Sequence, residues 1–310
     1  MEPLQIVFMG TPDFSVPSLK AIHAAGFTIR AVYTQPDKQR GRGKKVSASP
    51  VKECAEKLGI PVFQPQTLKD PDVIAGLADL KPDVIVVIAY GKILPKAILD
   101  IPRYGCLNVH GSLLPAYRGA APIQYAIKDG VRTSGVTIMM LGEGMDTGKM
   151  LKKAEIVLDA KETTGTLFDK LAIVGAETLI PVLKDLPAYE AAAQSQDESK
   201  ATYTAKITKE MTHIDFSQPA VVIERLIRTL DPHPGAYILH EGHRLKLWAA
   251  DVVPGTEAEP GTIIEVTKTY ITVQTGCDAL RIREVQPESR KRMATAQFLQ
   301  GCHLTVGSML

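Results

Sequence analysis

Clustered cysteines and histidines are missing from this sequence. Its four cysteines, at positions 54, 106, 277 and 302, are widely scattered and form no C-x-x-C pair. Scattered thiols of this kind predict neither a zinc site nor a disulfide framework, and they are typical of a protein in a reducing compartment. We therefore expect a cytoplasmic protein without a metal site.

Long apolar runs and a strong net charge are missing as well. The longest apolar run, residues 84–90, is far too short to span a bilayer. The run at residues 6–9 has no basic segment before it and is expected to be a strand, not a signal peptide. The net charge is +2 in 310 residues, with 45% hydrophobic and 23% charged residues. This ordinary globular composition predicts no membrane partner and decides neither for nor against nucleic acid.

The first part of the chain has the pattern of an α/β domain. Short apolar runs, which alternate with helical patterns, predict strands buried on both faces of a mostly parallel sheet. An antiparallel pair is expected at one edge of that sheet. The sequence thus predicts a doubly wound catalytic domain over residues 1–186. The expected strands are residues 4–9, 28–33, 84–89 and 107–109, with residues 135–140 and 150–157 as the edge pair.

The remainder of the chain has a different pattern. Residues 187–208 are polar and alanine-rich, which indicates a linker. Residues 209–310 begin with a helical pattern, and five short strand patterns follow, separated by glycine and proline turns. This spacing predicts a small C-terminal β-barrel.

Two glycine-containing loops do not fit the common nucleotide motifs. Gly10 follows the first strand, but the second and third glycines of a dinucleotide fingerprint are missing. The loop from Gly142 to Lys149 is one residue too long for a P-loop, and Met150 stands where a magnesium-binding hydroxyl is needed.

Asn108 and His110 are the strongest candidates for catalytic residues. They are two positions apart on an expected strand, so their side chains point to one face. An amide beside an imidazole, with a carboxylate such as Asp146 to orient it, suits a reaction that develops negative charge on a carbonyl oxygen. Cys106 lies on the same strand face. Its thiol is either catalytic or a small buried side chain of the core. Asp146 is alternatively a turn residue in a glycine-flanked loop.

The residues around these candidates resemble a known family. Residues 108–124 (NVHGSLLPAYRGAAPIQ) and 142–148 (GEGMDTG) closely resemble the folate-dependent formyltransferases. The segment FMGTPDFSVPSLKAI, the basic GRGKK loop and the long C-terminal region are similar to the branch that acts on initiator methionyl-tRNA. The resemblance extends from residue 6 to about residue 301. It implies formyl transfer from 10-formyltetrahydrofolate to the methionyl amino group in translation initiation, and a C-terminal domain with an oligonucleotide-binding-like fold.

The resemblance also assigns roles to individual residues. Asn108 and His110 would donate hydrogen bonds to the developing oxyanion, and Asp146 would hold His110 and help to move the proton. An α-amino group has a pKa near 7.7–8.0 in peptides, so no powerful base is needed to activate it. The residues expected to bind the folate are Ser112, Leu113, Leu114, Pro115, Ala89, Tyr90, Gly91, Met140, Gly142 and Gly144.

A basic loop is the expected contact with tRNA. Five cations lie within the eight positions from Lys38 to Lys45, and two glycines separate them. Such a loop suits a phosphate backbone, although a charge run can also be a solvated surface. Residues 209–310 hold 11 Lys and Arg against 12 Asp and Glu, so this region is not basic overall. The predicted tRNA contacts are Arg42, Lys44, Lys45, Lys206, Arg281 and Arg283.

Three alternative functions use the same observations. A formyltransferase for a small amine would share the three catalytic residues but has little need of a basic loop and a β-barrel. A formyltetrahydrofolate hydrolase usually has a regulatory domain before the first strand, which is expected here from residue 4. A tRNA-binding protein without catalysis has no need of Asn108, His110 and Asp146 together. We expect a monomeric enzyme with a folate co-substrate.

Overall fold

The computed structural model describes residues 4–40 and 45–310, and the chain forms two compact units. Each unit contains segments that are distant in the sequence. The division at residues 186 and 209 made from the sequence stays a prediction. Unit 1 consists of Met1–Pro122, Thr133–Val157 and Phe168–Thr204, and unit 2 of Ile123–Arg132, Leu158–Leu167 and Ala205–Leu310.

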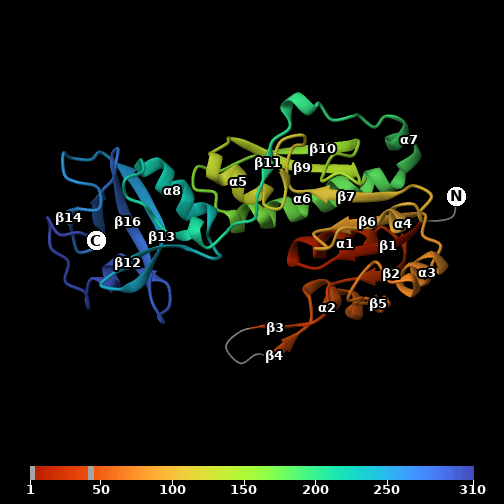
Figure 1. The fold of residues 1–310 in the computed structure, drawn as a ribbon, viewed down its shortest axis with the longest axis horizontal. Helices are drawn as coiled ribbons and strands as arrows, with labels where there is room; N and C mark the ends of the chain where they lie inside the picture. The colour runs from red at the N-terminus through yellow and green to blue at the C-terminus, as the bar shows by residue number, and fades with distance from the viewer. Residues whose placement is uncertain (1–3, 41–44) are drawn as a thin grey trace. The chain divides into compact units, whose positions relative to one another are not determined.

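A seven-stranded sheet forms the centre of unit 1 (Figure 1). Its strand order is β10-β9-β7-β6-β1-β2-β5. All neighbours from β7 to β5 are parallel, while β9 runs antiparallel to both β7 and β10. The predicted mostly parallel sheet with an antiparallel edge is thus confirmed. The strands are β1 (Gln5–Gly10), β2 (Thr28–Tyr33), β5 (Val62–Phe63), β6 (Val84–Ile88), β7 (Cys106–His110), β9 (Thr133–Met140) and β10 (Met150–Val157).

Two helices, α2 (Pro50–Lys57) and α3 (Pro71–Asp79), begin at sequence signals that are readable locally. The Ser49 side chain accepts a hydrogen bond from Lys52 N (3.1 Å) at the start of α2, and Asp70 accepts one from Asp72 N (3.0 Å) at the start of α3. A proline occupies the first helical position in both helices. The elements are η1 (Asp13–Ser15), α1 (Val16–Ala24), α2 (Pro50–Lys57), α3 (Pro71–Asp79), α4 (Lys96–Leu99), α5 (Pro122–Asp129), α6 (Thr164–Lys184), α7 (Leu186–Ala191) and η2 (Glu198–Lys200).

The predicted basic loop is flanked by a two-stranded ladder. Strand β3 (Lys38–Arg40) pairs antiparallel with β4 (Lys45–Ser47), and the pair extends away from the sheet of unit 1 (Figure 1). At its base, Asp37 accepts hydrogen bonds from Lys52 Nζ and from Gln64 Nε2, both at 2.7 Å. These bonds hold the pKa of the Asp37 carboxyl below its usual value. Of the predicted tRNA contacts, Arg42 and Lys44 lie outside the described residues, and so does the side chain of Lys45.

Unit 2 contains a six-stranded antiparallel sheet with helix α8 beside it (Figure 1). The order is β12-β13-β16-β15-β14, with β17 paired to β16. Fully buried Leu247, Leu280 and Ile282 belong to its apolar core. The small C-terminal β domain predicted from the sequence is confirmed, and its strands pair antiparallel. The elements are η3 (Glu210–Thr212), α8 (Ala220–Thr229), β12 (Ala236–His240), β13 (His243–Val253), β14 (Ile263–Val266), β15 (Ile271–Gln274), β16 (Ala279–Pro287), β17 (Met293–Ala294) and α9 (Thr295–Phe298).

A further short pairing connects two distant segments of unit 1. Strand β8 (Arg118–Gly119) pairs in parallel with β11 (Tyr203–Thr204), so the segment before residue 205 packs against the residues that follow β7. Within residues 4–40 and 45–310, no helix has the length and apolarity to cross a membrane.

The stability of unit 1 is expected to depend on the apolar contacts of its central strands. Ile85 in β6 is fully buried, whereas Ile173 on α6 is 55% exposed. We predict that Ile85→Ala lowers the free energy of unfolding by about 2–5 kcal/mol, because the cavity left behind cannot collapse fully. Ile173→Ala is the matched control and should change it by no more than about 0.5 kcal/mol. Urea titration measures both, and equal losses would contradict the assignment of this core.

Candidate active site

Asn108 and His110 lie on β7, which is the last parallel strand of the sheet. Asn108 pairs with Val87 on one side and with Met139 on the other, and His110 pairs with Thr137. Their side chains share a face because the strand is extended. Asn108 is half-buried, and its amide makes no hydrogen bond to any residue that the structure describes. This amide is therefore available to a ligand.

Asp146 comes to this strand from the loop between β9 and β10. The N–H of Gly119 donates a hydrogen bond of 2.8 Å to Asp146 Oδ2. The same oxygen lies 3.7 Å from His110 Nδ1, which is beyond ordinary hydrogen-bond length. Asp146 has a backbone φ of 53°, a left-handed conformation that aspartate tolerates better than most residues. The structure thus brings the three predicted catalytic residues together.

The two ring nitrogens of His110 have different neighbours. Nε2 lies 3.0 Å from the carbonyl oxygen of Tyr117. A carbonyl oxygen only accepts, so Nε2 carries a hydrogen and donates it. Nδ1 is then the nitrogen that faces Asp146. The His110 imidazole is buried and is hydrogen-bonded to the backbone of Tyr117. The Asn108 amide makes no hydrogen bond to a described residue, so it is the side chain of the two that can still donate one.

A cavity of about 460 Å³ opens where β6, β7 and β9 end. Asn108 and Asp146 both line it. His110 does not, and lies behind the lining residues. Five of the residues predicted to bind folate also line this cavity, namely Ala89, Tyr90, Gly91, Gly142 and Gly144.

The cavity also has apolar walls beyond the single residues predicted to bind folate. Ile93 is 89% exposed and Met145 is 63% exposed, although both are large apolar side chains. Val87, Leu94, Leu99 and Leu141 also belong to the apolar lining. Exposed apolar groups beside a cavity are typical of a site for a ligand with a flat apolar surface. The sequence signal was the Ile93–Leu94 pair, which closely follows Gly91 after a buried strand.

The Ser112–Pro115 segment and Met140 are not part of this lining. The Ser112 hydroxyl donates to the carbonyl of Ala116 at 2.6 Å. The N–H of Leu114 donates to Thr137 Oγ1 at 3.1 Å, and the Leu114 carbonyl accepts a hydrogen bond from Lys153. These bonds keep the chain that follows His110 against β9. The predicted folate contacts of Ser112, Leu113, Leu114, Pro115 and Met140 stay predictions.

The alternative of a catalytic thiol at Cys106 has no support in the structure. Its side chain is 1% exposed and packs in the apolar cluster that contains Ile85. Burial raises the pKa of this thiol to about 12, so the nucleophilic thiolate is strongly disfavoured at neutral pH. Cys106 is a core residue. In the part of the chain that is described, no group of three or more His, Cys, Asp or Glu could hold a metal ion.

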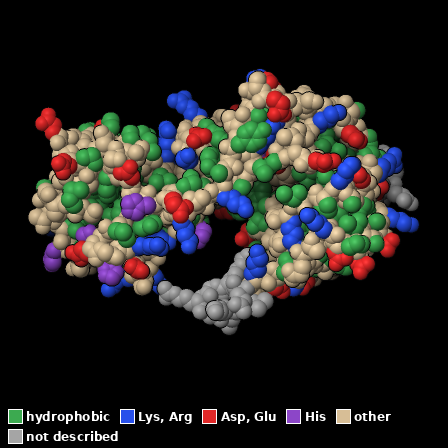
Figure 2. Space-filling model, in the orientation of Figure 1, with side chains coloured by type: hydrophobic (Ala, Val, Ile, Leu, Met, Phe, Trp, Pro, Cys, Tyr) green, Lys and Arg blue, Asp and Glu red, His purple; other side chains and the backbone are tan. Residues whose placement is uncertain are grey.

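Two of the predicted tRNA contacts in the C-terminal region are engaged with carboxylates. Arg281 and Arg283 lie on β16, with their guanidinium carbons 4.3 Å and 4.9 Å from the centre of the Tyr270 ring. Arg281 pairs with Glu265 at 3.7 Å, and Arg283 pairs with Asp251 at 2.9 Å. Lys206 is exposed. Acidic and basic side chains are interspersed over unit 2 on the face drawn in Figure 2.

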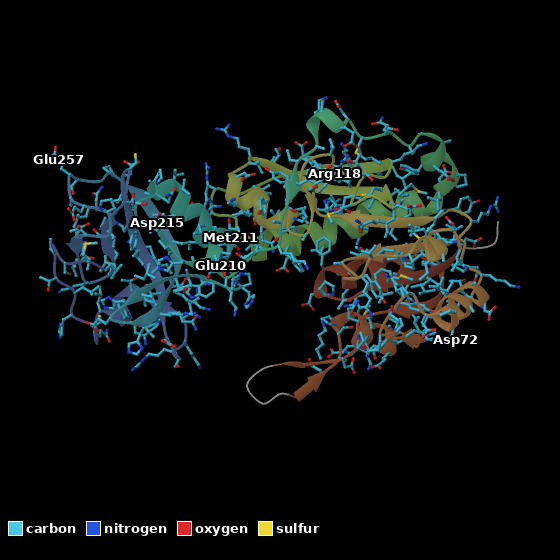
Figure 3. The ribbon with its side chains drawn as sticks, in the orientation of Figure 1. Asp72, Arg118, Glu210, Met211, Asp215 and Glu257 are labelled. Atoms are coloured by element: carbon cyan, nitrogen blue, oxygen red, sulfur yellow. The ribbon has the colours of Figure 1, made fainter. Side chains whose placement is uncertain are left out.

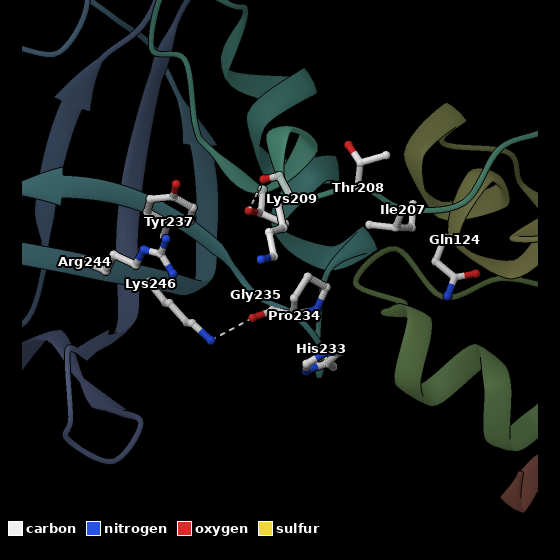
Figure 4. Close-up of a pocket in the computed structure, with 11 residues that line it drawn as sticks. Gln124, Ile207, Thr208, Lys209, His233, Pro234, Gly235, Tyr237, Arg244 and Lys246 are labelled. Atoms are coloured by element: carbon white, nitrogen blue, oxygen red, sulfur yellow. Dashed lines mark hydrogen bonds between the residues drawn. The ribbon is translucent and has the colours of Figure 1, made fainter. Parts of the chain in front are cut away.

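A second cavity, of about 540 Å³, lies within unit 2 (Figure 4). Lys209, Arg244 and Lys246 line it together with His233 and Tyr237, and its lining includes no Asp or Glu. The Arg244 guanidinium lies over the Tyr237 ring at 4.8 Å, and Lys246 Nζ donates to the Pro234 carbonyl at 2.7 Å. The sequence analysis missed this cavity because its cations come from separate segments and form no run.

Comparison with known proteins identifies the family. Residues 4–183 match the formyl transferase family, and residues 206–303 match the formyl transferase C-terminal domain. The chain belongs to the formyl transferase family, as its motifs predicted. It is 49% identical over 306 residues to methionyl-tRNA formyltransferase of Agathobacter rectalis, covering 98% of this chain and 99% of the relative. It is 48% identical over 308 residues to methionyl-tRNA formyltransferase of Caldanaerobacter subterraneus, covering 99% and 100%.

A solved structure has the same fold at low sequence identity. WlaRD, a sugar 3N-formyl transferase crystallised in the presence of dTDP and 5-N-formyl-THF, aligns with a TM-score of 0.65 at 17% identity. The alignment covers 94% of this chain and 100% of WlaRD. At this identity, the likeness concerns the fold alone.

The Asp146 loop depends on a glycine at position 148. A Cβ atom there would lie 1.7 Å from the Met140 carbonyl oxygen, whereas a Cβ on Gly76 would meet nothing within 4 Å. We predict that Gly148→Ala lowers kcat for formyl transfer by at least about tenfold, because a loop shift of the order of 1 Å misplaces Asp146. Gly76→Ala is the matched control and should keep near-normal kcat, because Gly76 lies on α3 and does not line the cavity. Equal rates for the two variants would show that the loop tolerates the clash.

Proposed function

We propose that this chain transfers the formyl group of 10-formyltetrahydrofolate to the α-amino group of initiator methionyl-tRNA, as a cytoplasmic monomer. The observation that carries this proposal is the meeting of Asn108 and Asp146 at one cavity. It occurs in a chain 48–49% identical over nearly its full length to methionyl-tRNA formyltransferases. Both the formyl donor and the tRNA are substrates.

The first chemical requirement is stabilisation of negative charge on the formyl oxygen. The amine attacks the formyl carbon, a C–N bond forms, and the electron pair of the C=O bond moves to oxygen. The Asn108 amide supports this step because it lines the cavity and has no partner among the described residues. Loss of one such donor typically lowers the rate by about 10²–10³. We assign the oxyanion contact to Asn108, because His110 does not line the cavity and its Nε2 already donates to the Tyr117 carbonyl.

The second requirement is transfer of a proton from the attacking amine to the departing nitrogen of the folate. Asp146 lines the cavity, and its Oδ2 accepts the Gly119 N–H, which fixes the carboxylate beside His110. Because His110 Nε2 is committed to the Tyr117 carbonyl, Nδ1 is the nitrogen that can exchange a proton with Asp146. The Asp146–His110 pair therefore serves as the proton relay.

The cavity suits the folate in size and chemistry. Its volume of about 460 Å³ falls within the range of small-molecule sites, roughly 300–1,000 Å³. Leu94, Leu141 and Met145 offer apolar contacts to a flat ring, and the glycine-containing loops expose backbone groups that can bind its polar edge. We place the pterin ring of the donor in this cavity.

The tRNA is proposed to contact unit 2 at its basic cavity. Lys209, Arg244 and Lys246 converge there without a lining carboxylate, and the exposed Lys206 precedes them in the chain. Phosphate oxygens are suitable partners for these cations. This surface favours a large polyanionic acceptor over a small amine. It likewise favours tRNA over water as the acceptor, because hydrolysis of the donor requires no second basic site.

The proton relay is tested by Asp146→Asn. Asparagine tolerates the left-handed φ of 53° and still accepts the Gly119 N–H, so the fold should be retained. We expect kcat to fall by about 10²–10⁴, because the amide cannot take up the proton. Single-turnover formylation of methionyl-tRNA measures the rate, and thermal unfolding confirms the fold. Near-normal turnover in a folded Asp146→Asn variant would remove Asp146 from the mechanism.

The tRNA surface is tested by Lys209→Ala and Arg244→Ala. Each should raise KM for methionyl-tRNA with little change in kcat. Each should also reduce the log–log slope of binding against salt concentration by about 0.7–0.9 for every phosphate that the variant no longer neutralises. Lys268→Ala, an exposed lysine in the turn after β14, is the matched control. Unchanged KM and salt slope in both test variants would exclude this cavity from tRNA binding.

A further inference from the structure

Arg118 is a fully buried arginine in unit 1 (Figure 3). Its guanidinium has five N–H donors, and all five are used. The hydrogen bond to Glu198 is the main reason why the pKa of Arg118 lies above its usual value. The bonds run to Gln196 Oε1 (3.0 and 2.9 Å), to the two carboxylate oxygens of Glu198 (2.9 and 2.7 Å) and to the Tyr203 hydroxyl (3.0 Å).

Gln196 connects Arg118 to the loop that carries Asp146. Arg118 can only donate, so the oxygen of the Gln196 amide must face it and the NH₂ group must point the other way. That NH₂ group donates to the carbonyl of Asp146 at 2.7 Å and to the carbonyl of Gly148 at 2.8 Å. Every hydrogen of the Gln196 amide is thus bound to the backbone of the loop that carries Asp146.

Asp146 also accepts a hydrogen bond from Gly119, the residue that follows Arg118. The N–H of Gly119 binds the Asp146 carboxylate, while Gln196 binds the Asp146 backbone. A left-handed φ is unfavourable for most non-glycine residues, and such a conformation persists only where its surroundings fix it. The two bonds fix Asp146 at its side chain and at its backbone carbonyl, and so stabilise this conformation.

We propose that Arg118 and Gln196 are positioning residues for Asp146 in the proposed formyl transfer. Arg118 fixes the orientation of the Gln196 amide, and Gln196 fixes the loop so that the Asp146 carboxylate stays beside His110. This inference rests on the proposed function, because it acts through the proton relay. The alternative is that Arg118 has a structural role alone and only holds Glu198 and Tyr203 in place.

Gln196→Glu separates the two roles. The new carboxylate still accepts both Arg118 bonds, so residues 196–204 remain anchored, but it cannot donate to the Asp146 and Gly148 carbonyls. Arg118→Ala would leave Glu198 and Gln196 without their partner, and a loss of fold would obscure the result. We expect Gln196→Glu to lower kcat about 10- to 100-fold with a nearly unchanged thermal midpoint.

Gln194→Glu is the matched control. It introduces the same charge two residues away on an exposed side chain and should keep the normal kcat. The decisive measurement is a double-mutant cycle, in which Gln196→Glu is added to Asp146→Asn. If Gln196 acts through Asp146, the second substitution produces little further loss, whereas independent effects multiply.

The outcomes distinguish this inference from the proposed function. A native enzyme that does not formylate methionyl-tRNA contradicts the proposed function itself. If the native enzyme is active and Asp146→Asn is inactive, normal kcat in Gln196→Glu overturns the positioning role alone. A full 10- to 100-fold further loss in the double variant overturns it as well, because Gln196 would then act without Asp146.

Discussion

The hydrogen bond from the Gly119 N–H to the Asp146 carboxylate is the contact on which the geometry of the site depends. It joins the loop after β9 to the segment after β7, and it leaves Asp146 Oδ2 3.7 Å from His110 Nδ1. Gly148 lets the loop pass against the Met140 carbonyl, where a Cβ atom would lie 1.7 Å from the carbonyl oxygen. Without the Gly119–Asp146 bond, Asn108 and His110 would still share a strand face, but no carboxylate would face the imidazole.

The parallel sheet determines where this contact forms. Fully buried β6 places Ala89, Tyr90 and Gly91 at one side of the cavity, and antiparallel β9 brings its own loop to the other side. Asn108 lies between them because β7 pairs with both strands. An active site at the carboxyl ends of parallel strands is the general arrangement in such folds. In this chain, the antiparallel edge strands supply the acidic residue.

Much of this arrangement could be predicted from the sequence because its determinants are local. Apolar runs marked β1, β2, β6 and β7, and the two-residue spacing of Asn108 and His110 placed them on one face. The glycines around Asp146 indicated a tight loop. Each of these signals lies within a few residues of the feature that it predicts.

The contacts that support Asp146 could not be predicted, because they join distant residues. Gln196 is 50 positions from Asp146, and Arg118 is 80 positions from Glu198. Bonds from a side chain to a remote backbone leave no periodic pattern in a sequence. The basic cavity could not be predicted for the same reason, because its cations lie in separate segments. They are Lys209, and Arg244 and Lys246 on β13. Arg281 and Arg283 were predicted to contact tRNA, but in the structure both are paired with carboxylates. The sequence alone does not show such pairing, because the partners lie on other strands.

The most direct test of the account is a competition between acceptors. The native enzyme would receive 10-formyltetrahydrofolate with initiator methionyl-tRNA and glycinamide ribonucleotide in the same reaction, and both formylated products would be quantified. We expect formyl-methionyl-tRNA as the product, because the acceptor must present an α-amino group and a sugar–phosphate backbone. Formylation of the small amine alone would contradict the role given to the second unit while leaving the Asn108 and Asp146 chemistry in place.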